Sequence, residues 1–175
     1  MKLVSNDGNV LIRNFTENDL PKLVEYAANK NVSKNLRDAF PSPYTLKDAW
    51  EFYEIVKDEE PRTNFAIEFQ GEYAGNIGLV IGTDVYRNSA ELGFFIGEPH
   101  WNKGITSQAV NLITKYAFEK LGIVRIFSIV FEYNVASQRV LEKCGFEKEA
   151  IFKKSITKKG IIYDEIRYSK INPKY

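Results

Sequence analysis

The sequence contains one cysteine and one histidine among its 175 residues. A single cysteine excludes a disulfide within the chain and fits a reducing compartment. One histidine and one cysteine also argue against a dedicated zinc site. No stretch approaches the roughly 18–20 consecutive apolar residues of a membrane span, and the first residues do not form a signal segment. We therefore expect a cytoplasmic protein with no metal centre.

An excess of charge of one sign is also lacking. Twenty-four basic and twenty-three acidic side chains leave a formal net charge of +1. This balance argues against broad electrostatic binding to nucleic acid or to a membrane. The length and the 44% hydrophobic composition suit one domain with a substantial core, so we expect a single domain over residues 1–175. Monomer and homodimer both stay open.

Hydrophobic periodicity divides the chain into strands and helices. Helix-start signals stand at Thr16, Thr45, Gly104 and Asn134. In the last helix, the pattern places Ala136, Val140, Leu141 and Cys144 on the inward side, and Cys144 suits the core better than nucleophilic catalysis. The order βααβββαβαββ predicts a mixed α/β domain with short-linked antiparallel strands and one parallel pair around the third helix. The predicted strands are residues 10–13, 64–70, 73–81, 89–96, 124–131, 146–156 and 161–171.

The segment Trp101-Asn102-Lys103-Gly104-Ile105-Thr106-Ser107-Gln108-Ala109 lies between a predicted strand and a predicted helix. The first N–H groups of a helix have no partner inside the helix, and the helix dipole adds positive potential there. Gly104 would allow close approach of a bulky anion, and Lys103 adds a positive charge. The segment therefore favours phosphate binding, although an ordinary surface loop before a helix is the alternative.

Three sequence blocks together resemble the GNAT superfamily of N-acetyltransferases, and most closely the branch of ribosomal-protein N-terminal acetyltransferases. The first is Ala90-Glu91-Leu92-Gly93-Phe94-Phe95-Ile96, and the second is the segment from Trp101 to Ala109. The third is Asn134-Val135-Ala136-Ser137-Gln138-Arg139-Val140-Leu141-Glu142-Lys143-Cys144-Gly145-Phe146. The order of elements agrees with the family along nearly the whole chain.

The loop departs from the family motif at two of its three places. The motif has Gln or Arg, two residues, Gly, one residue, and then Gly or Ala. Gly104 matches, whereas Trp101 and Thr106 do not. Asn102 replaces a glycine of many relatives, but asparagine tolerates a left-handed backbone, so the loop shape can survive. The departures affect the expected affinity more than the identity of the ligand.

The resemblance implies a GNAT fold, which is a mostly antiparallel twisted sheet with helices on both faces. In that fold two parallel strands splay apart around the pantetheine arm of acetyl-CoA, the acetyl donor. Backbone N–H groups of the loop would hold the pyrophosphate, and a backbone N–H of the strand would polarise the acetyl carbonyl. The implied cofactor-binding residues are Phe94, Phe95, Ile96, Asn102, Lys103, Gly104, Ile105, Thr106, Ser107, Asn134, Arg139 and Lys143.

The resemblance also implies direct attack of a primary amine on the acetyl group in a ternary complex. Glu91 is the first candidate for the base, acting directly or through a water, and Glu132 is the weaker alternative. Ser137 is implied near the departing sulfur, with Tyr133 as a rival acid. Each has a structural alternative: Glu91 as a solvated strand residue, and Ser137 as part of a first helical turn.

Other candidates leave alternatives open. Asn134 can cap a helix as well as bond the cofactor. Arg139 and Lys143, four residues apart on one helix face, could meet the 3′-phosphate or simply face solvent. His100 has no metal partner in the sequence and is interpreted as a loop residue. Aromatic and apolar side chains that could line an acceptor pocket or pack the core are Leu36, Phe40, Tyr44, Trp50, Tyr53 and Tyr163.

The acceptor is the least determined part of the hypothesis. An α-amino group has a pKa near ~8, against ~10.4 for lysine, so it needs less help to lose a proton. By analogy, a protein or peptide α-amine is favoured, followed by a small-molecule amine. A catalytically silent acyl-CoA-binding sensor is the alternative of another class. An ATP-binding protein is a further one, although the loop lacks the eight-residue phosphate-loop pattern.

Overall fold

The computed structural model describes all 175 residues, and its contacts divide the chain into two compact units. The first unit comprises residues 1–78 and 94–112, and the second comprises residues 79–93 and 113–175. Strands β4 (Glu72–Ile81) and β5 (Ser89–Ile96) and helix α4 (Ile105–Lys120) each run through both units. Each unit is described by itself below, and the single domain expected from length and composition stays a prediction.

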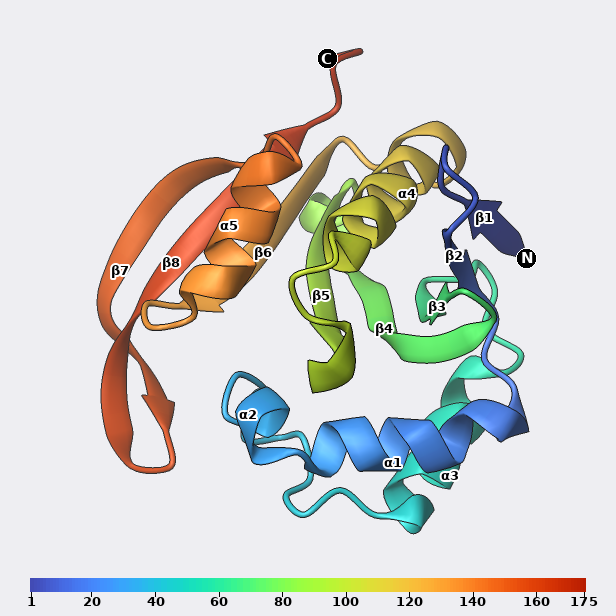
Figure 1. The fold of residues 1–175 in the computed structure, drawn as a ribbon. Coiled ribbons are helices and arrows are strands. Elements are labelled where there is room, and N and C mark those ends of the chain that lie inside the picture. The colour runs from blue at the N-terminus through green and yellow to red at the C-terminus, as the bar shows by residue number, and fades with distance from the viewer. The chain divides into compact units, whose positions relative to one another are not determined.

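Antiparallel strands form the sheet of the first unit (Figure 1). The neighbours follow the chain order β1 (Lys2–Val4), β2 (Val10–Arg13), β3 (Asn64–Phe69) and β4. Lys2 pairs with Arg13, Val10 with Phe69, and Asn64 with Gly78. Alternation along β2 buries Val10 and Ile12 completely, as expected for a strand with one face on a core.

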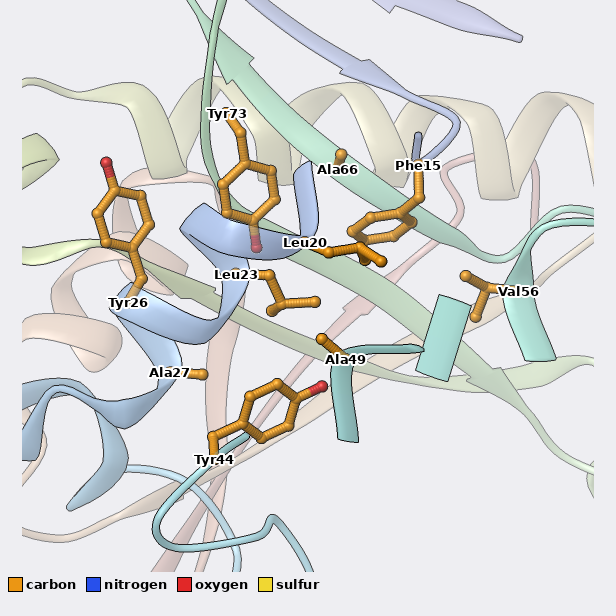
Figure 2. Packing of buried hydrophobic residues seen from close by; sticks show 10 residues of the cluster. All are labelled: Phe15, Leu20, Leu23, Tyr26, Ala27, Tyr44, Ala49, Val56, Ala66 and Tyr73. Carbon is orange, nitrogen blue, oxygen red and sulfur yellow. The ribbon is translucent and has the colours of Figure 1, made fainter. Parts of the chain in front are cut away.

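Two helical segments of the first unit begin at capping boxes, at the helix starts that the sequence predicts. Thr16 and Asp19 cap the turn η1 (Glu17–Asp19), which leads directly into α1 (Leu20–Ala28). Thr45 and Asp48 do the same for α3 (Leu46–Val56). A short α2 (Lys30–Ser33) lies between them. Figure 2 shows the core beneath these helices, formed by Phe15, Leu20, Leu23, Tyr26, Ala27, Tyr44, Ala49, Val56, Ala66 and Tyr73.

The second unit contains the parallel strand pair and a long C-terminal hairpin (Figure 1). Strand β6 (Arg125–Phe131) pairs in parallel with β5 and antiparallel with β8 (Ile161–Ile171), which in turn pairs with β7 (Glu147–Lys158). Helix α5 (Val135–Lys143) connects β6 to β7. The turn of the hairpin has left-handed backbone at Lys159 and Gly160, which matches the twist of the flanking strands.

The strand order β1-β2-β3-β4-β5-β6-β8-β7 confirms the predicted mixed α/β class, mostly antiparallel with one parallel pair. Strand β1 and helix α2 were not expected, because three or four residues are too short for a periodic pattern. The inward placement of Leu141 and Cys144 is confirmed, whereas that of Ala136 is wrong: Ala136 is exposed, and Gln138 is buried on α5 instead. None of the helices has the length and apolar character needed to cross a membrane.

Candidate active site

The parallel ladder between β5 and β6 is short. It begins at Ser89 opposite Arg125 and ends at Glu91 opposite Phe127. Both strands continue beyond this point, β5 to Ile96 and β6 to Phe131. The buried hydroxyl of Ser128 donates to the carbonyl of Leu92 at 2.9 Å, so a side chain replaces the next ladder bond. The end of β5 is therefore not paired with its parallel neighbour.

A tight turn and a loop connect the end of β5 to α4 within the first unit. The turn η3 (Glu98–His100) follows the strand, and the indole N–H of Trp101 donates to the carbonyl of Ile96 at 3.0 Å. Asn102 and Gly104 have φ values of 60° and 74°, so both are left-handed. Asn102 therefore adopts the left-handed backbone that asparagine was expected to tolerate, and the Trp101 side chain bonds to the end of β5.

Gly104 immediately precedes α4, which begins at Ile105. A Cβ built on Gly104 would meet no atom within 4 Å, so the glycine is required by its backbone angle rather than by crowding. A glycine has no side chain with which to cap the helix. The first N–H groups of α4 therefore depend on partners outside the helix, which is the condition for anion binding.

Aromatic side chains of the first unit surround the end of β5. The rings of Phe95 and Phe40 meet edge to face at 6.0 Å between centroids, and Phe40 stacks on Tyr44 at 4.7 Å. The ammonium of Lys103 lies 6.0 Å from the ring centre of Phe69. Tyr44 is buried in the core, whereas Trp50 is exposed and meets Tyr53 edge to face. Of the predicted wall residues, one is therefore buried and one is exposed, and the other four are half-buried: Leu36, Phe40, Tyr53 and Tyr163.

The start of α5 brings several predicted residues of the second unit together. The side chain of Asn134 accepts a hydrogen bond from the backbone N–H of Ser137 at 3.2 Å, which makes it the cap of the helix. Tyr133, just before the cap, stacks on Phe131 at 5.3 Å and meets Tyr163 at 4.8 Å. The Gln138 amide donates to the carbonyl of Glu132 at 3.0 Å. Capping by Asn134 is confirmed.

The β7–β8 hairpin holds the segment that precedes this cap. The backbone N–H of Asp164 donates to the Glu132 carboxylate at 3.1 Å, and the backbone N–H of Glu132 donates to the Asp164 carbonyl. The Asp164 carboxylate accepts from the ammonium of Lys153 and the N–H of Lys154, and these contacts lower its pKa. The Glu132 carboxylate is therefore bonded to the hairpin, which makes Glu132 a weaker candidate for the base.

The predicted site residues divide between the two units. The first unit contains the end of β5 and the loop: Phe94, Phe95, Ile96, Asn102, Lys103, Gly104, Ile105, Thr106 and Ser107. The second contains Glu91, Tyr133, Asn134, Ser137, Arg139 and Lys143. Tyr133, Asn134 and Ser137 are grouped at the start of α5, whereas Arg139 and Lys143 are exposed along it. Glu91 is half-buried on β5.

His100 differs from its expected place as an ordinary loop residue. It is only 8% exposed, and its Nε2 lies 3.1 Å from the hydroxyl of Tyr26 on α1. Its Nδ1 is buried without a hydrogen-bond partner. Burial, followed by the charge of Lys103, lowers the pKa of this imidazole, so it is neutral. Sequence spacing offers no signal for a contact between residues 26 and 100.

A depression of about 600 Å³ in the first unit contains none of the predicted site residues. Its charged side chains include Arg13, Asp19 and Glu68. The Arg13 guanidinium donates to both Asp19 oxygens, at 2.7 and 2.8 Å, and also to Glu68. These groups satisfy one another and join η1 to β2 and β3, which is a structural role.

Comparisons with known proteins agree with this geometry. A family model described as an acetyltransferase (GNAT) domain matches residues 9–147. The chain is 36% identical over 103 residues to the uncharacterized N-acetyltransferase YoaA of Bacillus subtilis (strain 168), covering 59% of this chain and 58% of YoaA. It therefore spans less than two thirds of that relative. YnaD of the same organism, an uncharacterized N-acetyltransferase, is 29% identical over 161 residues, covering 91% of this chain and 92% of YnaD.

Solved structures give the same result. A GNAT-family acetyltransferase from Bacillus anthracis superimposes with a TM-score of 0.85 at 26% identity, covering 98% of this chain and 99% of that one. Mycobacterium smegmatis RimJ, in complex with CoA-disulfide, has the same fold, with a TM-score of 0.85 at 18% identity, covering 99% and 87%. Since the family model also covers most of the sequence, the chain belongs to the GNAT family of acetyltransferases.

Proposed function

We propose that this protein is an acetyl-CoA-dependent N-acetyltransferase that acts on a primary amine. The observation that carries the proposal is the start of α4, where Gly104 stands in the cap position and Asn102 is left-handed. This loop follows the end of β5, where the parallel ladder has already stopped. A helix start with a glycine at its cap position and a strand end that is not paired with β6 are what a pyrophosphate and an amide-containing pantetheine arm require.

We assign the loop and strand residues of the first unit to the donor. Backbone N–H groups of Asn102 to Ser107 would bind the pyrophosphate, with Lys103 adding positive charge. Phe94 to Ile96 would bind the pantetheine arm as a strand binds its neighbour. Acetyl-CoA would supply the acetyl group as an activated thioester. A backbone N–H of β5 would donate to the acetyl oxygen as negative charge develops on it, worth a few kcal/mol in comparable sites.

The second unit supplies the candidates for proton transfer. Glu91 would take the proton that the amine must lose, directly or through one water, as the C–N bond forms. When the C–S bond breaks, the hydroxyl of Ser137 would stabilise or protonate the sulfur, with Tyr133 as the alternative donor. Asn134 would bond the donor in addition to capping α5, and Arg139 and Lys143 would meet the 3′-phosphate.

The acceptor class rests on chemistry and analogy. A protein or peptide α-amine remains the favoured acceptor because it deprotonates more easily than a lysine side chain. A polyamine is a specific small-molecule candidate, since a neighbour at a TM-score of 0.80 and 22% identity is a spermidine N-acetyltransferase from Vibrio cholerae in complex with CoA and spermine. That likeness concerns the fold, so the two acceptors must be separated by experiment.

The first test is a calorimetric titration with acetyl-CoA, with ATP as the control ligand. We expect saturable binding of acetyl-CoA and none of ATP. Release of CoA thiol is then measured with a peptide bearing a free α-amine, the same peptide with its α-amine blocked and a lysine retained, and spermidine. Binding without turnover on any amine would favour a silent acyl-CoA sensor. No binding of acetyl-CoA by folded protein would overturn the proposal.

A further inference from the structure

Three residues of the turn between β5 and the phosphate-binding loop, Gly97, Glu98 and His100, contact α1, α2 or Asn29 between these helices. The Glu98 carboxylate accepts hydrogen bonds from the amide of Asn29 at 2.7 Å and from that of Asn31 at 3.0 Å. His100 Nε2 lies 3.1 Å from the Tyr26 hydroxyl. A Cβ on Gly97 would come within 2.6 Å of the Tyr26 ring. The turn thus fits closely against this part of the first unit.

The Tyr26–His100 pair is the most deeply buried of these contacts. Tyr26 is 5% exposed, and its ring stacks on Tyr73 at 6.0 Å in the core of Figure 2. The imidazole meets the rings of Tyr26 and Phe69 edge to face, at 5.6 and 6.3 Å. Because Nδ1 has no partner, the bond to Tyr26 is the hydrogen bond that fixes the orientation of the ring.

Two buried polar side chains add little net stability compared with apolar side chains of the same shape. Their main effect is on geometry, since the hydrogen bond fixes the position of His100 and thereby the position of the loop that follows it. Only Trp101 to Gly104 separate His100 from the first residue of α4. Two of these four residues, Asn102 and Gly104, have left-handed backbone. This conformation is sterically costly for Asn102, and fixing Gly104 in it costs conformational entropy. The turn is therefore well placed to hold that conformation.

We infer that Tyr26, Glu98 and His100 are positioning residues, which hold the pyrophosphate-binding loop in its binding conformation from α1 and α2. The inference rests on the proposed function, because it assumes that the loop binds the pyrophosphate of acetyl-CoA. It adds that the affinity for this part of the donor depends on side chains that do not touch the donor. Loss of the Tyr26–His100 bond would loosen the loop and leave the binding of a pyrophosphate-free donor unchanged.

The test compares acetyl-CoA with S-acetylpantetheine, which lacks the pyrophosphate and the nucleotide. For Tyr26→Phe we expect acetyl-CoA to bind about fivefold to tenfold more weakly, whereas the dissociation constant of S-acetylpantetheine, followed by NMR titration, stays as in the wild type. His100→Leu and Glu98→Ala should give the same pattern, because leucine cannot hydrogen-bond to Tyr26. Tyr73→Phe is the matched control, because it removes a buried hydroxyl that bonds to Asn76 rather than to the turn.

A double-mutant cycle sharpens the result. Tyr26→Phe and His100→Leu remove the same hydrogen bond, so the double variant should bind acetyl-CoA about as weakly as either single variant. Thermal unfolding verifies that each variant is folded. Equal loss of affinity for both ligands would mean general loosening and would overturn the inference, as would unchanged acetyl-CoA binding in Tyr26→Phe. If the wild type itself does not bind acetyl-CoA, the proposed function fails as well.

Discussion

The starts of α4 and α5 solve the same physical problem in different ways. Helix α5 is closed by its own residue, since the Asn134 side chain accepts the N–H of Ser137. Helix α4 follows Gly104, which has no side chain, and its approach is shaped by left-handed residues. A self-capped start is stable without a ligand, whereas an uncapped one leaves donors for an external anion. The difference supports our proposal that the start of α4 binds the pyrophosphate, and it shows that the start of α5 has a structural role of its own.

The largest expected effect comes from placing a negative charge at the start of α4. In Gly104→Asp, the carboxylate would repel the pyrophosphate and compete for the first N–H groups of the helix. We expect the dissociation constant of acetyl-CoA to rise about 100-fold, measured by calorimetry.

Gly104→Asn is the control for this change. Asparagine has nearly the same shape as aspartate and also tolerates a left-handed backbone, but it carries no charge. Its loss of affinity should stay within about tenfold. Equal losses in the two variants would attribute the effect to backbone strain, and unchanged affinity in folded Gly104→Asp would remove the loop from the donor site.

The sequence alone predicted much of this contrast, because both starts are local features. Gly104 and Asn134 were identified from the residues around them, and Asn102 was expected to tolerate the left-handed backbone that it adopts. The helix starts at Thr16 and Thr45 were recognisable for the same reason. Interactions within a few residues leave a spacing in the sequence that can be read directly.

The contacts that hold the loop could not be predicted from the sequence. Tyr26 and His100 are 74 residues apart, and Asn29 and Glu98 are 69 apart. No periodicity connects such positions, since a long-range pair is set by the packing of whole elements. The exposure of Ala136 was missed for a related reason: a buried glutamine, Gln138, replaces an apolar side chain because the Glu132 carbonyl satisfies its amide.

The next prediction asks whether the start of α5 also contacts the donor. Asn134→Ala should lose the cap and about 1 kcal/mol of unfolding free energy. Asn134→Asp keeps a good capping group but cannot donate from its side chain. If Asn134 donates to acetyl-CoA, the Asp variant should keep its stability and bind the donor about tenfold more weakly, by thermal unfolding and calorimetry.

Thr45→Ala is the matched control, because it removes the cap of α3 and should lower stability without changing the affinity for acetyl-CoA. Wild-type affinity in Asn134→Asp would leave Asn134 as a cap alone. Of the two helix starts, only that of α4 would then be a candidate for binding the donor.

A smaller effect is expected for Ser137→Ala. The backbone N–H of Ser137, not its hydroxyl, takes part in the cap, so the helix should be retained. If the hydroxyl assists the departing sulfur, kcat should fall about fivefold to tenfold while the affinity for acetyl-CoA stays constant. Ser155→Ala, on the exposed hairpin, serves as the control. An unchanged kcat would leave Tyr133 as the remaining candidate for the acid.

The smallest expected effect is a change of stability with pH, and it concerns His100 in the turn before α4. His100 is the only histidine of the chain, and burial, together with the charges of Lys103 and Lys22, outweighs Glu72 and lowers its pKa. Below about pH 6.5 the unfolded chain binds a proton that the folded protein does not. The free energy of unfolding should therefore fall as the pH is lowered from 7.5 to 5.5, in urea titrations. In His100→Gln this fall should be smaller, since glutamine does not titrate. An equal fall in both proteins would mean that folding does not lower the pKa of His100.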